Sequence, residues 1–195
     1  MSEDPTPPTA PAAPAGSATP VGPAISAAPA GAAGPVPVDR AAGRRMYDDF
    51  LAAHPEVPRR DDTEVICFGD TPAAADEILG FIVTGAKRAT ATLVAGYHAS
   101  GDPFPPLGAY WVCCDGAGVP RAVLWTTELR LGPFHSVDAR FAWDEGEYDR
   151  TLATWVDGHR AAYERQCARL GIEFSEDLEI CFERFTLVWP PDLAD

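Results

Sequence analysis

The composition of the chain changes abruptly near residue 43, and this change limits how much of the chain can fold. Residues 1–43 consist largely of Pro, Ala, Gly and Ser, with hardly any charge and no aromatic residue. Such a segment cannot bury enough apolar surface to offset the conformational entropy lost on ordering. We therefore predict a disordered, Pro/Ala-rich tail over residues 1–43 and one folded domain over residues 44–195.

Apolar periodicity and turn residues divide the folded part into helices and strands. The helices are expected over residues 44–53, 72–83 and 150–170, and the strands over residues 64–68, 88–94, 107–115, 119–130 and 178–189. Residues 97–106 are predicted to form a loop, and residues 134–141 an irregular segment or a short strand. The mixed order, without a βαβ repeat, favours an α+β fold: a small mixed or antiparallel β-barrel of about five to six strands with flanking helices.

The net charge limits the kinds of partner. The formal charge is −14 at pH 7, whereas sequence-independent binding to nucleic acid depends on Lys and Arg side chains that neutralise phosphates. A surface this acidic repels a long polyanion unless one groove is basic. The charge therefore favours a small molecule or a protein as partner, disfavours long nucleic acid, and leaves a nucleoside open.

The cysteines and the apolar segments indicate the cellular compartment. The five cysteines are odd in number and include no Cys-x-x-Cys pair, so we predict buried free thiols and neither a disulfide framework nor a zinc site. The sequence has no apolar run of the roughly 20 residues that a membrane span needs, and no secretion signal. We expect a cytoplasmic protein that binds no membrane, metal or cofactor.

Lys87 is the sole lysine in a chain with fourteen arginines. It follows Gly85, which stands where a helix commonly ends in a left-handed glycine. A lysine there can satisfy free helix carbonyls, which is a structural role. Unlike arginine, it can also lose its proton when desolvated and act as a base or nucleophile. Position and residue type together leave both roles open.

The motif Gly85-x-Lys87-x-x-Thr90 resembles the signature of the ASCH superfamily, a group of PUA-like β-barrels. Similarity to one branch of that superfamily extends over residues 64–189. It includes the segments Phe68-Gly69-Asp70, Pro133-Phe134, Ala142…Glu145-Gly146-Glu147, Trp155 with His159, and Glu183-Arg184-Phe185. The chain departs from that branch at Tyr148, where its relatives usually carry glycine. Tyrosine lacks the freedom of glycine at positive φ, so the loop that carries the carboxylates is expected to lie differently here.

The resemblance implies a cleft lined by the motif and an association with RNA or modified nucleosides. Some members are amidohydrolases that remove the acetyl group of N4-acetylcytidine with a Lys, a Thr and a Glu. By motif match these residues are Lys87, Thr90 and Glu145. Other members of the family are reported to cleave single-stranded RNA. The residues that the resemblance suggests for substrate binding are Gly85, Arg88, Trp155 and His159. The implied partner is a nucleoside-like small molecule or a short single-stranded RNA.

Three roles for Lys87, Thr90 and Glu145 follow from their chemistry. In amide hydrolysis, Thr90 supplies the hydroxyl, Lys87 accepts its proton if desolvation favours the neutral amine, and Glu145 protonates the leaving nitrogen or orients the lysine. Positions 87 and 90 of a strand face opposite sides, so both reach one cleft only if residues 87 and 88 lie in a turn. The alternatives are ligand binding without turnover and a structural ion pair of Lys87 with Glu145 or Glu147.

For the remaining polar residues we expect structural roles. His159 lies on the apolar face of its helix, which favours a core histidine with one hydrogen bond. Trp155 is expected in the core rather than as a platform on which a base stacks, and the charges of residues 142–149 are expected to be mostly solvated.

Overall fold

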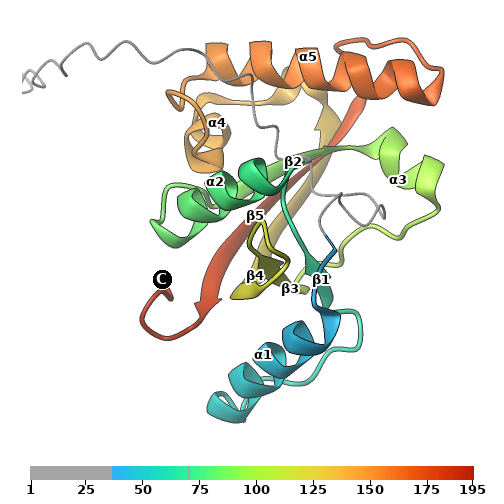
Figure 1. Ribbon diagram of the computed structural model, residues 1–195. Coiled ribbons are helices and arrows are strands. Elements are labelled where there is room, and N and C mark those ends of the chain that lie inside the picture. The colour runs from blue at the N-terminus through green and yellow to red at the C-terminus, as the bar shows by residue number, and fades with distance from the viewer. Residues whose placement is uncertain (1–36, 70) are drawn as a thin grey trace, which may run out of the picture.

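The structure is a computed structural model that describes residues 37–69 and 71–195 (Figure 1). The predicted tail therefore lies outside the described residues as far as residue 36, as does Asp70. Thr71 caps the helix expected over residues 72–83, because its side chain accepts a hydrogen bond from Ala74 N. Pro72 then occupies the first helical turn, where its missing N–H leaves no hydrogen bond unmade.

The centre of the domain is a five-stranded mixed sheet. Its order is β1-β3-β4-β5-β2, in which β1 pairs with β3 in parallel and every other pair is antiparallel. The strands are β1 (Glu64–Ile66), β2 (Ala89–Leu93), β3 (Tyr110–Cys114), β4 (Pro120–Pro133) and β5 (Glu179–Trp189). The long strands β4 and β5 twist through the domain and curl the sheet into a half-barrel (Figure 1). The predicted α+β fold with a small mixed sheet is confirmed.

Helices surround the sheet, and two of them were not expected. The helices are α1 (Arg40–Ala53), α2 (Pro72–Val83), α3 (Val94–Ser100), α4 (Ala139–Glu145) and α5 (Leu152–Leu170), with a short 3-10 helix at Phe134–Ser136. Helix α1 begins four residues before the expected residue 44, because the Asp39 side chain caps it by accepting from Ala42 N. The expected loop over residues 97–106 instead begins as α3, whose seven residues are too few for a helical period to be evident.

Helix α4 corrects the expectation for residues 134–141. The Asp138 side chain accepts a hydrogen bond from Phe141 N at the start of the helix, and Gly146 ends it in the left-handed conformation. These are ordinary start and stop signals. They were not recognised because the seven residues between them include Trp143, Asp144 and Glu145, which carry no clear apolar period.

Alternate residues of the strands divide the core between the two faces of the sheet. On β5, Phe185 and Leu187 pack with α2, whereas Ile180 and Phe182 pack with α4 and α5. Helix α1 covers β1 and β3 through Tyr47. This alternation decides which face every polar residue of the sheet must occupy.

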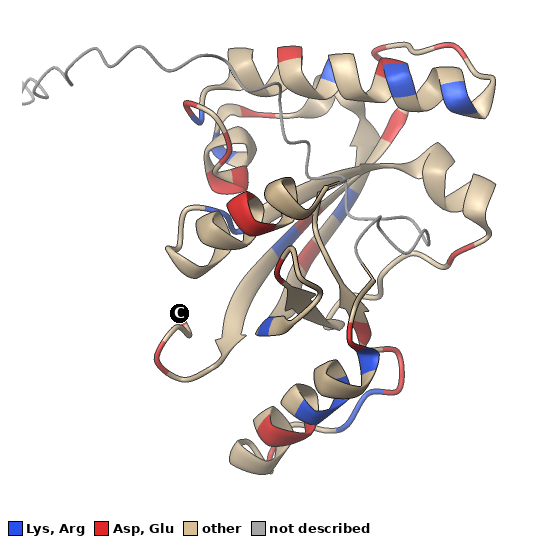
Figure 2. Cartoon of the chain, viewed as in Figure 1, with Lys and Arg blue, Asp and Glu red and all other residues tan. Residues whose placement is uncertain are grey.

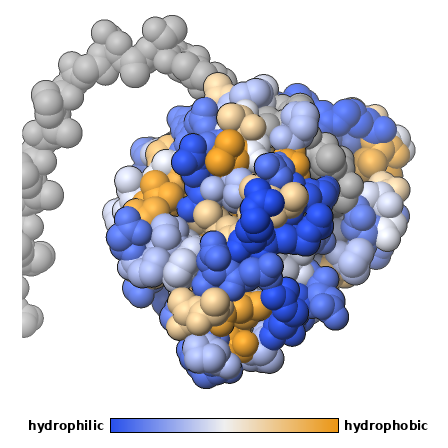
Figure 3. All heavy atoms as spheres, turned by 60° about the horizontal axis from the view of Figure 1, so that its bottom comes forward, coloured by the Kyte–Doolittle hydropathy of each residue, from blue (hydrophilic) through white to orange (hydrophobic). Residues whose placement is uncertain are grey.

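Acidic residues recur on exposed connections. They include Asp61 after α1 and Glu173 and Asp177 between α5 and β5 (Figure 2). On the face shown in Figure 3, apolar side chains form small separate patches between hydrophilic ones. No helix of the described residues is long and apolar enough to cross a membrane.

Candidate functional site

The turn between α2 and β2 carries the first half of the motif. Gly85 follows Thr84, the C-cap of α2, with a φ of +81°, a conformation that glycine adopts without strain. Lys87 N then donates to Phe81 O at 3.0 Å. Because β2 begins only at Ala89, Lys87 and Arg88 both lie in the turn. The geometric condition for Lys87 and Thr90 to reach one cleft is therefore met.

The loop between α4 and α5 is held against this turn. Arg88 N donates to Asp144 O at 2.6 Å, and Arg150 donates to Ala86 O at 3.2 Å. Gly146 comes so close that a Cβ atom there would lie 2.2 Å from Ala86 O. A side chain is therefore excluded at residue 146, and the loop delivers the residues on either side of Gly146 to Lys87.

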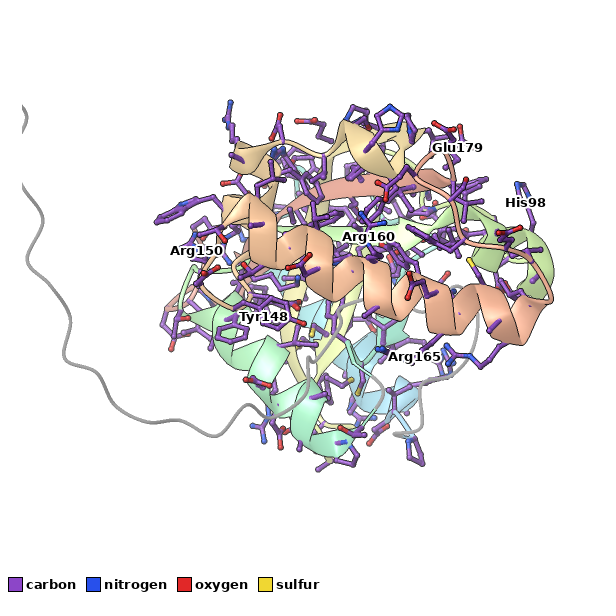
Figure 4. All side chains as sticks on the ribbon, turned by 90° about the horizontal axis from the view of Figure 1, so that it is seen from above. His98, Tyr148, Arg150, Arg160, Arg165 and Glu179 are labelled. Atoms are coloured by element: carbon purple, nitrogen blue, oxygen red, sulfur yellow. The ribbon has the colours of Figure 1, made fainter. Side chains whose placement is uncertain are left out.

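Tyr148 adopts a positive φ of 53° in this loop although it is not glycine. Its ring lies along α5 (Figure 4), where a Cβ atom at Gly158 would come within 3.2 Å of the ring. The absence of a side chain at Gly158 leaves room for the tyrosine. This packing compensates for the unfavourable backbone conformation of Tyr148.

Lys87 is the centre of a buried group of charges. Its ammonium donates to Glu147 Oε1 at 2.8 Å and to the backbone carbonyl of Glu145 at 3.2 Å, and Glu145 Oε1 lies 3.9 Å away. The exposed fraction is 0% for Lys87 and Glu145 and 5% for Glu147. Together with His159, these residues form what we call the Lys87 cluster.

Helix α5 holds Glu145 in place. The Trp155 indole N–H donates to Glu145 Oε2, and His159 Nε2 lies 3.2 Å from the same oxygen. His159 Nδ1 donates to the Trp155 carbonyl at 3.0 Å, and the two rings stack with centroids 3.9 Å apart. The expectation that both rings are buried is confirmed. His159 makes one hydrogen bond among the described residues, as expected, and the nearby Glu145 carboxylate adds an ion pair when the ring is protonated.

The charges of the Lys87 cluster shift one another's titration. Burial on its own raises the pKa of Glu145, but the charges of His159 and Lys87 outweigh burial and hold this pKa below its ordinary value. For Glu147 burial dominates, and its pKa is raised. Burial opposes protonation of His159, yet the Glu145 carboxylate raises the pKa of the ring. The cluster therefore contains one strongly ionised acid and one that accepts a proton more readily.

The expectation that the charges of residues 142–149 are mostly solvated was wrong for the two central acids. Glu145 and Glu147 are buried, whereas Asp149 is exposed and accepts hydrogen bonds from Thr151. Lys87 compensates the buried acids from about sixty positions earlier in the chain. Local composition shows a high charge density but not the distant cation that permits burial.

A second group of buried polar side chains lies on the face of the sheet that meets α2. Glu183 lies opposite Thr90 in the β2–β5 register, and its Oε1 accepts hydrogen bonds from Trp111 Nε1 at 3.1 Å and from the Thr126 hydroxyl. Burial raises the pKa of Glu183 to about 7, although these two hydrogen bonds lower it. We call Thr90, Trp111, Thr126 and Glu183 the Glu183 row.

Sequence reasoning did not select Glu183 or Glu147 as site residues. The sequence did carry a signal for Glu183. It is an acid at an inward-facing position of β5, between the buried residues Cys181 and Phe185. An acid at such a position must be paired or protonated. For Glu147 the signal was only the possibility of pairing with Lys87.

Two tyrosines connect the Lys87 cluster with the Glu183 row. Burial raises the pKa of Tyr163, and nearby Glu145 contributes to this shift. Burial also raises the pKa of Tyr97, which Glu183 raises further. Tyr97 and Tyr163 are themselves close enough to interact electrostatically. Acids of both groups therefore contribute to the raised pKa values of these buried hydroxyls.

Four polar atoms of these residues have no hydrogen-bond partner among the described residues: Glu145 Oε1, Glu147 Oε2, His159 Nε2 and Tyr163 Oη. Buried polar atoms are nearly always hydrogen-bonded in folded proteins. Donors and acceptors that converge without partners are typical of a site that receives a polar ligand.

Arg88 is directed away from this region. Its guanidinium donates to the carbonyls of Ile82 and Lys87, each at 2.7 Å, and to the Asp195 carboxylate. Arg88 thus satisfies carbonyls at the end of α2 and fixes the chain end. Gly85 supplies the turn, and an added Cβ atom would meet Arg88 at 3.7 Å.

The search for metal ligands gives no site within the described residues, where no three His, Cys, Asp or Glu side chains are suitably grouped. All five cysteines are buried and free, as predicted. The chemistry available in this region is therefore that of carboxyl, ammonium, imidazole and hydroxyl groups.

Comparison with known proteins identifies the family. The sequence model of the ASCH domain matches residues 64–189. The structure resembles the crystal structure of an ASCH domain from Lactobacillus crispatus JV V101, with a TM-score of 0.71 and 28% identity over 77% of this chain and 96% of that chain. It also resembles a DUF984 protein from Enterococcus faecalis V583, with a TM-score of 0.67 and 24% identity over 75% and 88% of the two chains.

A search of curated proteins gives no match. The family model covers well over half of the chain, and the chain belongs to the ASCH domain family. The predicted PUA-like architecture is thereby confirmed.

Proposed function

We propose that the domain binds a small N-acylated nucleoside, such as N4-acetylcytidine, beside the Lys87 cluster and the Glu183 row, and hydrolyses its amide bond. The observation that carries this proposal is that two carboxylates beside one buried ammonium each keep an oxygen without a hydrogen-bond partner, Glu145 Oε1 and Glu147 Oε2. An acylated base offers the carbonyl and amino groups that such a site can bind. The net charge of −14 supports a small substrate over a long nucleic acid.

In the proposed reaction, the Thr90 hydroxyl oxygen attacks the acyl carbon. Its proton passes to Glu147, whose raised pKa makes it the better base of the two cluster acids. The carbon–nitrogen bond then breaks, the nitrogen takes up that proton and leaves as the amine, and the acyl group remains on Thr90 as an ester. Water hydrolyses the ester, which releases the acid and restores the hydroxyl.

Lys87 serves as a fixed positive charge in this scheme. Its ammonium already donates to Glu147 and to the Glu145 carbonyl, so stabilising the negative oxygen of the tetrahedral intermediate suits it better than accepting a proton. Glu145, which Trp155 and His159 hold, keeps the ammonium in position.

A second candidate is binding of the same ligand without turnover. The observation in its favour is that the Lys87 ammonium already has two hydrogen bonds and, with Glu145, a further ion pair within the protein. In that case the cluster is a structural support, and the ligand or a short single-stranded RNA contacts only the neighbouring polar atoms.

The test is to measure cytidine released from N4-acetylcytidine by the full chain and by two matched variants, Thr90→Val and Thr92→Val. Both threonines are buried on the same face of β2. We expect release by the wild type, a loss of about 100-fold or more in Thr90→Val, and nearly unchanged release in Thr92→Val.

Equal losses of cytidine release in the two variants would show that Thr90 is not the nucleophile. Saturable binding of N4-acetylcytidine without release supports the binding module instead. A short single-stranded RNA is tested for binding and cleavage at low salt. Binding without cleavage indicates an RNA-binding module, and cleavage indicates a ribonuclease. If the chain neither binds nor converts any of these, the proposed function is wrong.

A further inference from the structure

A pocket opens between β1, β3 and the segment that follows α3. It spans about 450 Å³ of space that includes open solvent, no member of the Lys87 cluster lines it, and Trp111 of the Glu183 row forms part of its wall. Four aromatic rings contribute to its walls: Tyr97, Phe104, Tyr110 and Trp111. Three prolines of the segment 103–106 complete the apolar part of the lining.

The pocket also contains three carboxylates, one of which is bound by an arginine, because Arg60 donates to both oxygens of Asp62. Burial and the neighbouring charge of Asp102 raise the pKa of Glu64, whereas the charge of Arg40 lowers it. Asp102 Oδ2 is buried and has no hydrogen-bond partner among the described residues. Asp102 therefore offers a carboxylate oxygen with which a bound cation can pair.

The aromatic walls are held in fixed positions. The Trp111 indole N–H is shared between Glu183 Oε1 at 3.1 Å and Thr126 Oγ1 at 3.0 Å. The rings of Tyr97 and Phe104 lie 4.9 Å apart at an angle of 41°. Rings that are already ordered lose little conformational freedom when a ligand binds.

We propose that this pocket binds an organic ammonium ion. The negative face of an aromatic ring attracts a cation, and Glu64 and Asp102 supply the opposite charge. No Lys, Arg or His lines the pocket, so an anionic ligand such as a phosphate meets only repulsion. A hard divalent metal requires six or more oxygen ligands, which aromatic and proline walls do not provide. An alkylated ammonium fits both halves of the lining.

The test measures binding of choline chloride to the full chain by calorimetry, at constant ionic strength. The comparison ligand is 3,3-dimethylbutan-1-ol, which has nearly the same shape and no charge. We expect saturable binding of choline with a Kd of about 1 mM or tighter, and binding of the neutral alcohol at least about tenfold weaker.

Variants assign the binding to this pocket. Asp102→Asn and Phe104→Ala are each expected to weaken choline binding about tenfold, because one removes charge and the other a ring face. The control is Asp157→Asn, an exposed acid on α5 with no place in the pocket, which is expected to leave the Kd unchanged. Equal binding of the alcohol, or equal loss in Asp157→Asn and Asp102→Asn, would overturn the proposal.

A peptide that carries trimethyllysine identifies the source of the cation. If the peptide binds more tightly than choline and depends equally on Asp102, the natural ligand is a protein side chain, whereas tighter binding of choline indicates a free metabolite. Both results support the ammonium site. Failure of both ligands to bind would refute it.

Discussion

The Lys87 cluster and the Glu183 row are both buried and polar, but they solve the problem of burial differently. In the Lys87 cluster, the ammonium lies 2.8 Å from one carboxylate and 3.9 Å from another, so the charges compensate one another. In the Glu183 row, the acid accepts hydrogen bonds from an indole and a hydroxyl. Burial outweighs these two hydrogen bonds, and the pKa of Glu183 rises to about 7.

The difference indicates which residues are fixed and which can exchange protons. Paired charges are stable only together, because removing one partner leaves an uncompensated ion in the interior. An acid that is solvated by neutral donors can be protonated or ionised near neutral pH. Lys87 and Glu145 are thus suited to holding permanent charges, whereas Glu147 and Glu183, whose pKa values are raised, are suited to exchanging a proton.

The largest effect is expected when the cluster loses its cation. Lys87→Met leaves Glu145 and Glu147 buried with a much weaker balance of charge, and we expect a loss of about 3–5 kcal/mol in the free energy of unfolding. Urea denaturation measures this loss. Arg59→Met is the control, because its exposed pair with Asp48 is worth about 1 kcal/mol or less. A similar small loss in both variants would contradict the assignment of Lys87 as the essential counter-charge.

The second prediction concerns the pH dependence that Glu183 causes. Its pKa in the folded state, about 7, lies above the ordinary value of 4.5, so the folded state binds the proton more tightly. The contribution of Glu183 to stability is therefore complete below about pH 4.5 and is lost as the pH rises through about 7. Glu183→Gln should be more stable than the wild type at about pH 8, by about 3 kcal/mol at most, and nearly equal near pH 5.

Denaturation of the wild type and of Glu183→Gln across this pH range measures that difference. The control is Glu179→Gln, an exposed position on the same strand, which should follow the wild type throughout. A constant difference between wild type and Glu183→Gln at every pH would show that Glu183 does not titrate in the folded protein.

The smallest effect on stability is expected at the tyrosine that connects the two regions. Tyr163 Oη has no partner among the described residues, so Tyr163→Phe should change the free energy of unfolding by about 0.5 kcal/mol or less, or stabilise the protein. Tyr47→Phe is the matched comparison, because Tyr47 Oη accepts from Arg60 N at 3.2 Å and its loss should cost about 1 kcal/mol. If Tyr163→Phe destabilises the protein more than Tyr47→Phe does, the Tyr163 hydroxyl has a structural partner and is not available to a ligand.

The part of the site that sequence could predict is the part that local rules determine. Thr71 with Pro72 sets the start of α2, Gly85 sets its end, and the apolar strand that follows fixes where β2 begins. These signals placed Lys87 in a turn beside a helix end. The family resemblance then added Glu145, and the structure does bring it to Lys87.

The remainder depends on packing between segments far apart in the chain. Glu147 and Lys87 are 60 positions apart, and Thr126 and Glu183 are 57 apart. No local pattern states that such residues meet. Helix α4, which carries Glu145, was missed for a related reason, since seven residues are too few to display a helical period.

The central claim is that Thr90 and Glu147 act on one substrate. A double-mutant cycle on kcat/KM for N4-acetylcytidine, with Thr90→Val, Glu147→Gln and the double variant, tests it most directly. The account predicts that each single change lowers kcat/KM by about 100-fold or more, and that the double variant is hardly worse than the poorer single one. Losses that multiply in the double variant, or no loss in Thr90→Val, would contradict it.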